Sequence, residues 1–593
     1  MFKLLKFFSW QRWILIAILL VLLGVQVYCE IQIPVKIGDL VALFDHSIFP
    51  QNNESKTIII STIIYCGILI GILIINAIFS SIIASKFAYE IRLQLFKKVN
   101  SMSLAGVNHF TTASLISRNT IDIDTIASQF RDFLRIVLIG PFTIIFSLIM
   151  IGNQLALSNF SINIILIVIG ITTFLIIFFV SFILLVEKKA KKVDKNLDLI
   201  NDEISSVLTG AKIIKSFNAQ GFHLNNFQHL NKAISNNVRS INFSMCILYS
   251  LSYTFIDLIN ITVYWLGAWV LKTNGVFDDS ATLYPSQIIV VATFATLIIN
   301  AFLRTAGALA SLPKSIVSAR RVNEVLNYVD PIQDVKQLSK PFTTTGEITF
   351  KNVSFTYPNS AIPTLKGISF NVSKGQTLGI IGANGAGKST IIELMQRFYD
   401  CTKGSIAIDG IDVRQIPLKI LRNKIGYVSQ KVFLFRNTLK NNIYFKETKI
   451  NETLMKDIAD VSHLNDFITT LPHQYDAQIS ENGVNLSGGQ KQRVSIARAL
   501  AKNPEFLIFD NSFSALDYRT SKSVLKKILI KYKNTTKIIT SHRVADIANA
   551  DLILLIDQGK IVAHGSHREL YQKNKTYQQI VKSQITDQEA LLI

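Results

Sequence analysis

Residues 377–390 read TLGIIGANGAGKST, an apolar run that passes directly into a glycine-rich turn. Residues 377–381 have the pattern of a buried strand, and the residues after 390 have that of a helix. Glycines between them let backbone N–H groups curl around a phosphate, and the helix N-terminus adds positive potential. Lys388 can reach the β- and γ-phosphates of a nucleotide, and the Ser389 hydroxyl can ligate Mg²⁺. This stretch therefore predicts a nucleotide-binding α/β domain.

A second segment supplies the metal side of such a site. Residues 506–510 read FLIFD, an apolar strand that ends in Asp510, whose carboxylate can hold the water shell of a metal ion. The loop residues that we expect to contact the nucleotide are Gly382, Ala383, Asn384, Gly385, Ala386, Gly387, Lys388, Ser389 and Thr390.

A third segment offers another phosphate-binding helix start. Residues 486–490 read LSGGQ and place Ser487 at the N-cap of a predicted helix over 491–501, with two glycines directly behind it. This start lies about a hundred residues after Lys388, so the two cannot easily close on one nucleotide. The pattern favours a dimer in which ATP lies between two chains.

The first half of the chain has the composition of a membrane protein. Of 593 residues, 17% are charged, against about 25% in ordinary soluble chains, and the mean hydropathy is +0.35. Since a spanning helix needs about 20 mostly apolar residues, six spans are predicted near 13–34, 57–83, 136–157, 160–186, 243–271 and 286–310. The net charge of +21 combined with this hydropathy argues against a nucleic-acid partner. The four cysteines are too scattered for a disulfide framework or a zinc site.

The distribution of Lys and Arg predicts how these spans are oriented. Residues 187–242 carry nine of them, whereas residues 152–161 carry no charge. Both chain ends are therefore expected in the cytoplasm of a multi-pass plasma (inner) membrane protein, and much of the positive charge needs no anionic partner. Residues 1–12 alternate apolar and basic side chains, which suits a short helix lying in the lipid interface.

Several apolar stretches continue well beyond the membrane. A helix over 58–100 would run about 65 Å, which is twice the hydrocarbon thickness. Short segments marked by glycine, 101–112 and 210–222, lie between the projecting helices, and we expect them to dock on a cytoplasmic domain. A separate helical subdomain without that role is the alternative.

Three charged residues fall in or near the apolar spans, where ionisable groups are costly and often functional. Glu30 is expected near the outer end of its span and Arg304 near the inner end of its own, where long side chains can reach the interface. Asp257 is the candidate for a polar substrate cavity.

Together these segments resemble one known family, the ATP-binding cassette (ABC) exporters of the six-helix half-transporter type, over nearly all of the chain. The resemblance implies a membrane all-α domain of six helices over 13–328, with long cytoplasmic extensions. It is joined through a linker over 329–346 to a P-loop α/β nucleotide-binding domain over 347–593. Residues 110–118, FTTASLISR, resemble the first intracellular loop of bacterial heterodimeric multidrug exporters in particular.

The resemblance assigns roles to further residues. Tyr357 matches the aromatic that stacks on adenine, and His542 matches the switch histidine on the γ-phosphate. Gln430 matches the glutamine that contacts Mg²⁺ together with Ser389, while Asp510 acts through water. Residues 514–517, SALD, match the loop that crosses the dimer interface. The signature-motif residues that would contact the ATP of the partner chain are Ser487, Gly488, Gly489 and Gln490.

The chain departs from the family at one catalytic position. The residue after Asp510 should be a Glu that activates the attacking water, and here it is Asn511. A carboxamide cannot take up a proton, so the site is expected to bind ATP and hydrolyse it slowly. Three interpretations follow: a heterodimer whose partner carries the Glu, a homodimer with two weak sites, or an engineered trap. We prefer the first.

The expected function is ATP-driven export by a transport ATPase that pairs with a second half-transporter. The apolar helices favour amphipathic or hydrophobic drugs, lipids or peptides as substrates, and the expected cofactors are ATP and Mg²⁺. The main rival is an ATP-gated channel or regulator of the same fold, because such a protein tolerates a slow site.

Overall fold

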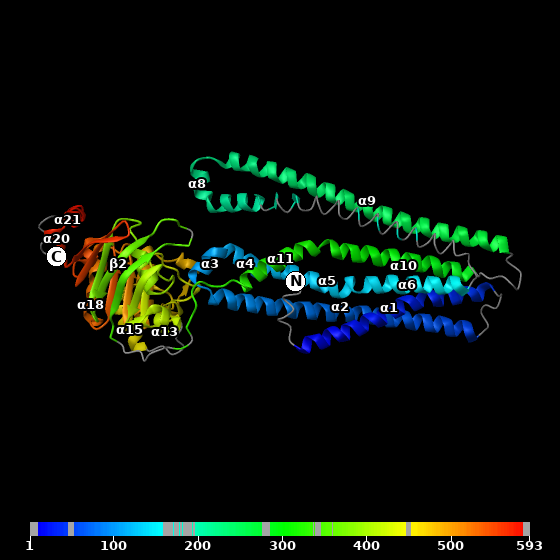
Figure 1. Ribbon diagram of the computed structural model, residues 1–593, viewed down its shortest axis with the longest axis horizontal. Helices are drawn as coiled ribbons and strands as arrows, with labels where there is room; N and C mark the ends of the chain where they lie inside the picture. The colour runs from blue at the N-terminus through cyan, green and yellow to red at the C-terminus, as the bar shows by residue number, and fades with distance from the viewer. Residues whose placement is uncertain are drawn as a thin grey trace. The chain divides into compact units, whose positions relative to one another are not determined.

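The computed structural model describes residues 10–45, 53–157, 201–274, 285–335, 345–358, 360–445 and 452–584, with isolated residues between 170 and 200. The chain forms two compact units (Figure 1). Met1–Ser101 and Thr111–Tyr328 make the first, here called the membrane unit. Met102–Phe110 and Val329–Ile593 make the second, here called the nucleotide unit.

The membrane unit is helical throughout its described residues. Its helices are α1 (Trp10–Asp45), α2 (Asn53–Ser101), α4 (Thr112–Ser117), α5 (Ile123–Asp132), α6 (Ile139–Leu157), α8 (Ala211–Ser216), α9 (Gln220–Asn274), α10 (Pro285–Ala310) and α11 (Leu312–Leu326), with the π-helical turns η2 (Arg118–Asp122) and η3 (Phe133–Val137) between α4 and α6. Of these, α2 has 49 residues and α9 has 55, so each is more than 70 Å long at about 1.5 Å per residue. Both are longer than a membrane is thick.

Within the described residues, five helical stretches are long and apolar enough to cross a membrane. They are Arg12–Ala42, Ser55–Ser101, Thr112–Asn153, Gln220–Trp269 and Ser286–Leu326. The predicted span over 160–186 falls largely outside the described residues.

The first helix is longer than the sequence pattern suggested. It was expected to leave the membrane near residue 34, but α1 continues through Pro34 to Asp45. Proline removes one backbone donor and still fits in a helix where neighbouring helices support it. As a result Glu30 lies well inside α1, not near its outer end, and that expectation was wrong.

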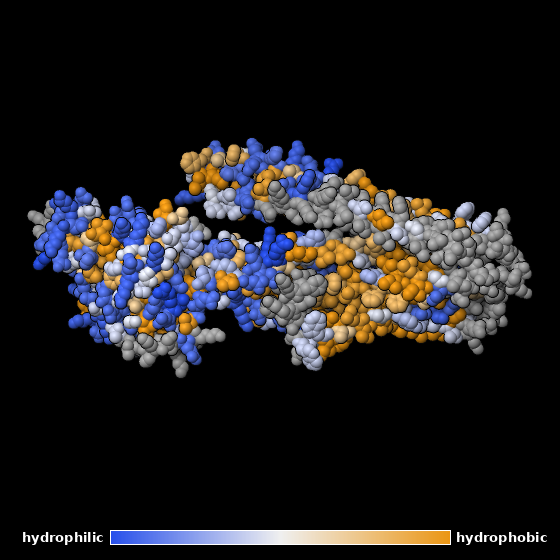
Figure 2. Space-filling view, viewed as in Figure 1, coloured by the Kyte–Doolittle hydropathy of each residue, from blue (hydrophilic) through white to orange (hydrophobic). Residues whose placement is uncertain are grey.

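Four helices of the membrane unit, α1, α2, α6 and α10, run side by side (Figure 1), and α9 packs on α10. Their shared core contains Val27, Ile151, Ile256 and Phe294, one each from α1, α6, α9 and α10. The outer surface of this bundle is also apolar, as Figure 2 shows, and it includes exposed side chains such as Trp265. An apolar core inside an apolar surface is typical of a helix bundle solvated by lipid.

The nucleotide unit contains two main sheets. The first is antiparallel, in the order β2-β1-β4-β5: β2 (Leu365–Val372), β1 (Ile348–Phe355), β4 (Lys403–Ile408) and β5 (Ile411–Asp412). The second has the order β12-β11-β3-β10-β9-β6: β12 (Lys560–Gly565), β11 (Leu552–Asp557), β3 (Thr377–Gly382), β10 (Thr536–Thr540), β9 (Phe506–Asp510) and β6 (Ile425–Val428).

The order of the second sheet determines where a ligand can bind. Strand β3 is parallel to β10 and β11, and β9 is parallel to β10 and β6. Parallel strands present their carboxyl ends at one edge of the sheet, and ligands bind outside that edge. The segments that follow β3, β6, β9 and β10 therefore meet at one edge.

Shorter elements complete the nucleotide unit. They are α3 (Leu104–Phe110), α12 (Lys388–Met395), α13 (Leu418–Lys424), β7 (Asn437–Thr438), α14 (Leu439–Ile443), α15 (Glu452–Val461), α16 (Asn465–Thr470), β8 (Gln478–Ile479), α17 (Gly488–Ala501), α18 (Tyr518–Lys531), α19 (Val544–Ile547), α20 (His567–Lys573) and α21 (Lys575–Lys582).

Helix α3 lies between α2 and α4 in the chain yet belongs to the nucleotide unit. The amide of Asn108 donates a hydrogen bond to the Tyr399 hydroxyl at 3.4 Å, and Ala105 packs against the buried core of this unit. Phe110 is buried. The expectation that the glycine-marked segment 101–112 docks on a cytoplasmic domain is confirmed for residues 102–110. The second predicted docking segment, residues 210–222, belongs to the membrane unit, so its docking stays a prediction.

Candidate nucleotide site

The glycine-rich turn connects β3, whose six residues are all buried, to α12. Gly387 is the N-cap of α12 and has φ +102°; a Cβ there would lie 2.6 Å from the Leu365 side chain. Gly385 has φ +79°. Only glycine adopts these angles at little cost. Such a turn in front of a helix N-terminus forms an anion-binding concavity.

Lys388 is fixed beside this turn. Its Nζ donates hydrogen bonds to the carbonyls of Gly382 and Ala383, both at 2.8 Å. Burial lowers the pKa of Lys388, and the negative charge of Asp510 partly offsets that effect. The lysine is therefore positioned by the loop itself for a phosphate that lies in it.

Asp510 is the last residue of β9 and forms the corner of the site that suits a metal ion. Its Oδ1 accepts hydrogen bonds from the Ser389 hydroxyl at 3.0 Å and from the Thr540 hydroxyl at 2.9 Å. Mg²⁺ prefers oxygen ligands, one or two of them carboxylates, and keeps several waters. The paired hydroxyl and carboxylate therefore fit Mg²⁺. Thr540 was not predicted, because the sequence does not show that β10 lies beside β9.

Tyr357 lies in a cluster of aromatic rings, and its hydroxyl contacts two residues of α12. Its hydroxyl is 3.0 Å from the Thr390 hydroxyl and donates to Glu393 Oε2 at 2.8 Å. The rings of Phe355 and Tyr399 pack against it, with centroids 4.8 and 5.2 Å away. Burial raises the pKa of both Tyr357 and Glu393. Sequence reasoning missed Glu393, since a glutamate on a helix carries no signal of its own.

Asn511 follows Asp510 in a left-handed conformation, with φ +47°. Its backbone N–H donates to the carbonyl oxygen and the hydroxyl of Thr540, at 2.9 and 3.0 Å. His542 lies two residues beyond Thr540. Burial and the positive charge of Lys388 lower the pKa of His542, while Asp510 opposes this. The lowered pKa favours a neutral imidazole at neutral pH.

The structure places the other predicted residues as follows. Gln430 is exposed, two residues beyond the end of β6, at the same sheet edge. Ser487 caps α17 in a capping box: its hydroxyl accepts from the Gln490 N–H at 3.2 Å, and its own N–H donates to Gln490 Oε1 at 2.8 Å. Gly488 and Gly489 form the first turn of α17. This helix start is preformed and largely exposed.

The charged residues of the predicted spans are arranged differently from the expectation. Glu30 and Arg304 line one cavity of the membrane unit, which was not expected for Glu30; Arg304 lies toward the C-terminal end of α10, in line with the expectation for it. Asp257 is exposed on α9 and is not among the residues that line this cavity.

Comparison with known proteins identifies the family. Residues 365–514 match the family model described as ABC transporter, and residues 13–302 match the model described as ABC transporter transmembrane region. An ATP-dependent lipid A-core flippase of Wigglesworthia glossinidia brevipalpis is 32% identical over 515 residues, which cover 86% of each chain. The chain belongs to the ABC transporter family. It is an ABC exporter half-transporter, a transport ATPase that binds ATP and drives export.

A second relative agrees with this assignment, and a solved structure shares the fold. A Bacillus subtilis protein named "Probable multidrug resistance ABC transporter ATP-binding/permease protein" is 45% identical over 266 residues, which cover 44% of this ABC exporter and 45% of the relative. The solved structure of a bacterial Atm1-family ABC exporter with ATP bound superposes with a TM-score of 0.80 at 22% identity, covering 97% of this chain and 98% of that one. The latter shows the fold.

Proposed function

We propose that this ABC exporter works as one half of a heterodimer in which its own nucleotide site hydrolyses ATP slowly. Asn511 carries the proposal. Thr540 holds its backbone directly after Asp510, and we expect the general base of the site at this residue. An amide at that point can orient water through a hydrogen bond but cannot remove its proton.

The rest of the site is equipped to bind ATP. The Lys388 ammonium, the turn over 382–387 and the start of α12 would hold the phosphates, and Tyr357 would turn its ring to the adenine. Mg²⁺, held by Ser389 and Gln430 and through water by Asp510, would neutralise phosphate charge when bound. The neutral imidazole of His542 would donate a hydrogen bond to the γ-phosphate. A site that binds well and turns over slowly suits a regulatory half of a pair.

The signature segment supports pairing with a second half-transporter. The capping box leaves the backbone N–H groups of Gly488 and Gly489 at an exposed helix start, which favours anions. We assign this start to ATP bound by the partner chain, whose Glu performs hydrolysis. A homodimer with two slow sites, an engineered trap and an ATP-gated channel or regulator are the competing interpretations.

The proposed location is the bacterial inner membrane, with both chain ends in the cytoplasm. One relative is named as a lipid A-core flippase and another as a probable multidrug resistance transporter. We propose that amphipathic or hydrophobic molecules of this kind, drugs, lipids or peptides, are the exported substrates.

Comparing the ATPase activity of the isolated chain with that of a co-expressed pair tests the proposal. The isolated chain should turn over far below the 1 to 10³ s⁻¹ typical of enzymes. Co-expression with a half-transporter that carries the Glu should bring activity into that range and enable ATP-driven uptake of an amphipathic dye into inverted vesicles. Robust turnover of the isolated chain would contradict the heterodimer, and activity without uptake would favour the channel or regulator.

A further inference from the structure

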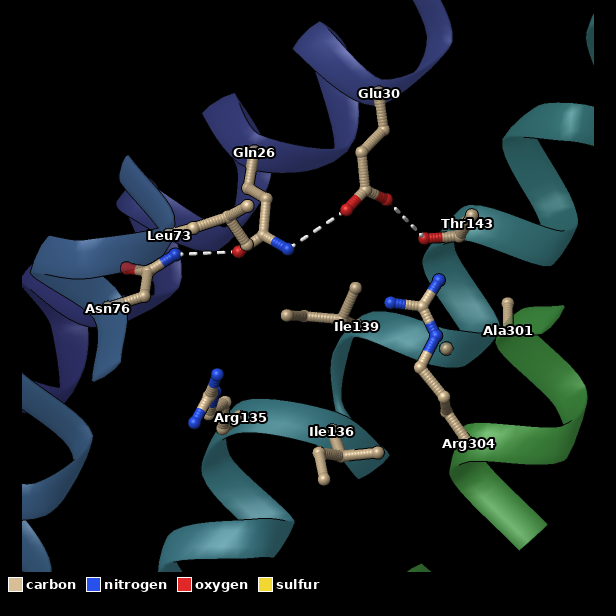
Figure 3. Close-up of a pocket in the computed structure, with 11 residues that line it drawn as sticks. Gln26, Glu30, Leu73, Asn76, Arg135, Ile136, Ile139, Thr143, Ala301 and Arg304 are labelled. Atoms are coloured by element: carbon tan, nitrogen blue, oxygen red, sulfur yellow. Dashed lines mark hydrogen bonds between the residues drawn. The ribbon is translucent and has the colours of Figure 1, made fainter. Parts of the chain in front are cut away.

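A polar cavity lies inside the apolar bundle of the membrane unit. It has a volume of about 260 Å³ and is lined by residues of α1, α2, η3, α6 and α10 (Figure 3). Three charged side chains line it: Glu30 from α1, Arg135 from η3 and Arg304 from α10. Ionisable groups at membrane depth are costly, and they usually mark a functional site.

The depth of the cavity follows from the helix lengths. At about 1.5 Å per residue, Glu30 lies about 22 Å from the end of α1 at Asp45, and Arg304 lies about 29 Å from the start of α10 at Pro285. The proposed orientation places both of these helix ends outside. With a hydrocarbon layer of about 30 Å, the cavity then lies in the inner half of the membrane.

A chain of hydrogen bonds holds the Glu30 carboxylate. The Asn76 amide donates to Gln26 Oε1 at 2.8 Å, and the Gln26 amide donates to Glu30 Oε1 at 3.0 Å. The Thr143 hydroxyl donates to Glu30 Oε2 at 3.4 Å. Asn76 and Gln26 are both buried. Both carboxylate oxygens therefore accept from neutral donors that are fixed by packing.

The two arginines are left facing the cavity. Among the described residues, neither Arg135 nor Arg304 forms an ion pair; the Arg304 Nε reaches only the carbonyl of Asn300 in its own helix, at 3.4 Å. Figure 3 shows the Arg304 guanidinium directed toward Glu30 and Thr143, with Arg135 on the other side of Ile139. Two positive charges and one negative charge leave the cavity with a net charge of +1.

The walls between the charges are apolar. Leu73, Ile136 and Ile139 line the same cavity, with Ile139 near its centre and Leu73 beside Gln26 (Figure 3). A ligand that fits this space combines an anionic group, able to accept two hydrogen bonds from each guanidinium, with an apolar body.

We propose that this cavity binds the acidic head group, phosphate or carboxylate, of an amphipathic molecule through Arg135 and Arg304. The proposal rests on the export function proposed above and narrows its substrate class. Gln26 and Thr143 hold the Glu30 carboxylate. Two guanidinium groups face one carboxylate in this cavity, so the acid of the ligand supplies the remaining counter-charge.

Equilibrium binding of radiolabelled octyl phosphate to the full chain in phosphatidylcholine nanodiscs tests the proposal, with empty nanodiscs as background. Binding should be saturable. Octanoate should compete, whereas octyltrimethylammonium and inorganic phosphate should not. Arg304→Gln and Arg135→Gln should each weaken binding at least tenfold, about 1.4 kcal/mol. Arg304→Lys, which keeps the charge, should lose less than Arg304→Gln.

Arg320→Gln is the matched control, because Arg320 is an exposed arginine of α11 outside the cavity. It should bind like the unmodified chain. If Arg304→Gln and Arg135→Gln bind octyl phosphate as tightly as the unmodified chain, the proposal is overturned. Displacement of octyl phosphate by octyltrimethylammonium would also overturn it. If inorganic phosphate displaces octyl phosphate and octanoate does not, the site binds a free anion, and the proposal of an amphipathic ligand is overturned.

The binding measurement needs neither ATP nor a partner chain. A failure here would therefore leave ATP-driven uptake by the co-expressed pair intact. Conversely, normal octyl phosphate binding by a pair that shows no ATP-driven uptake would contradict the export function and not the site.

Discussion

At the scale of single residues, we propose that the side chain of Asn511 determines how fast the nucleotide site turns over. Its neighbours are placed as a working site requires: Ser389 and Thr540 bond to Asp510, and Lys388 is held by the phosphate loop. Positioned general bases typically contribute 10²- to 10⁴-fold to a rate. In the proposed function, the lack of one proton acceptor is therefore sufficient to make this site slow.

Restoring that acceptor should restore turnover. We expect Asn511→Glu to raise the ATPase rate of the dimeric fraction of the isolated chain by about 10²-fold or more, since a carboxylate can take the proton of the attacking water. Asn511→Gln is the control, because it has the length of Glu without its basicity, and should leave the rate unchanged. An equal response of the two variants would show that Asn511 is not what limits the site.

Residues whose roles depend on local sequence were predictable, and residues brought in from elsewhere were not. The strand, turn and helix around Lys388 are contiguous, so their order alone indicated a phosphate loop. Thr540 and Glu393 reach the site through the order of the sheet and the packing of α12 on Tyr357, and neither is visible in a linear pattern.

At the scale of elements, the two glycine-marked segments have different surroundings. Helix α3 packs within the nucleotide unit and buries Phe110. Helix α8, in the membrane unit, has no buried residue, and Ile213, Phe217 and Phe222 in this segment are largely exposed. Exposed apolar side chains grouped at a helix tip favour docking on another surface.

We expect Phe222→Glu to uncouple ATP hydrolysis from transport while ATP binding stays intact. Because Phe222 is 72% exposed, the charge should cost little folding free energy in the chain itself. The comparison is ATPase activity against dye uptake by the same co-expressed pair, with Leu199→Glu, an exposed position outside the segment, as control. Loss of ATP binding in the Phe222 variant would mean that the segment is structural. Phe110→Glu should also uncouple, but it places a charge in a buried site and is the less selective variant.

The ends of the membrane helices were the least predictable feature at this scale. The apolar pattern placed the end of the first span near residue 34. The helix continues to Asp45, since tertiary packing overrides a single proline. This shift moves Glu30 to the depth of Arg304, so the polar cavity could not be foreseen from either residue alone.

At the scale of the whole molecule, the proposed heterodimer has two unequal nucleotide sites. One site combines Lys388 and Asn511 of this chain with the signature segment of the partner. The other combines the partner's phosphate loop and Glu with Ser487, Gly488 and Gly489 of this chain. In this proposed pair, the phosphate loop and the signature segment of the chain serve different sites, and the two sites contribute unequally to the total activity.

The steady-state ATPase activities of two variants, measured side by side in the reconstituted pair, test this assignment most directly. Lys388→Ala removes a phosphate contact from the slow site, so activity should fall modestly. Gly488→Asp sets a negative side chain against the γ-phosphate in the productive site, so activity should nearly vanish. In a homodimer both changes would strike identical sites, and both would abolish activity. A larger loss from Lys388→Ala than from Gly488→Asp would contradict the account, because it would make this chain's own site the productive one.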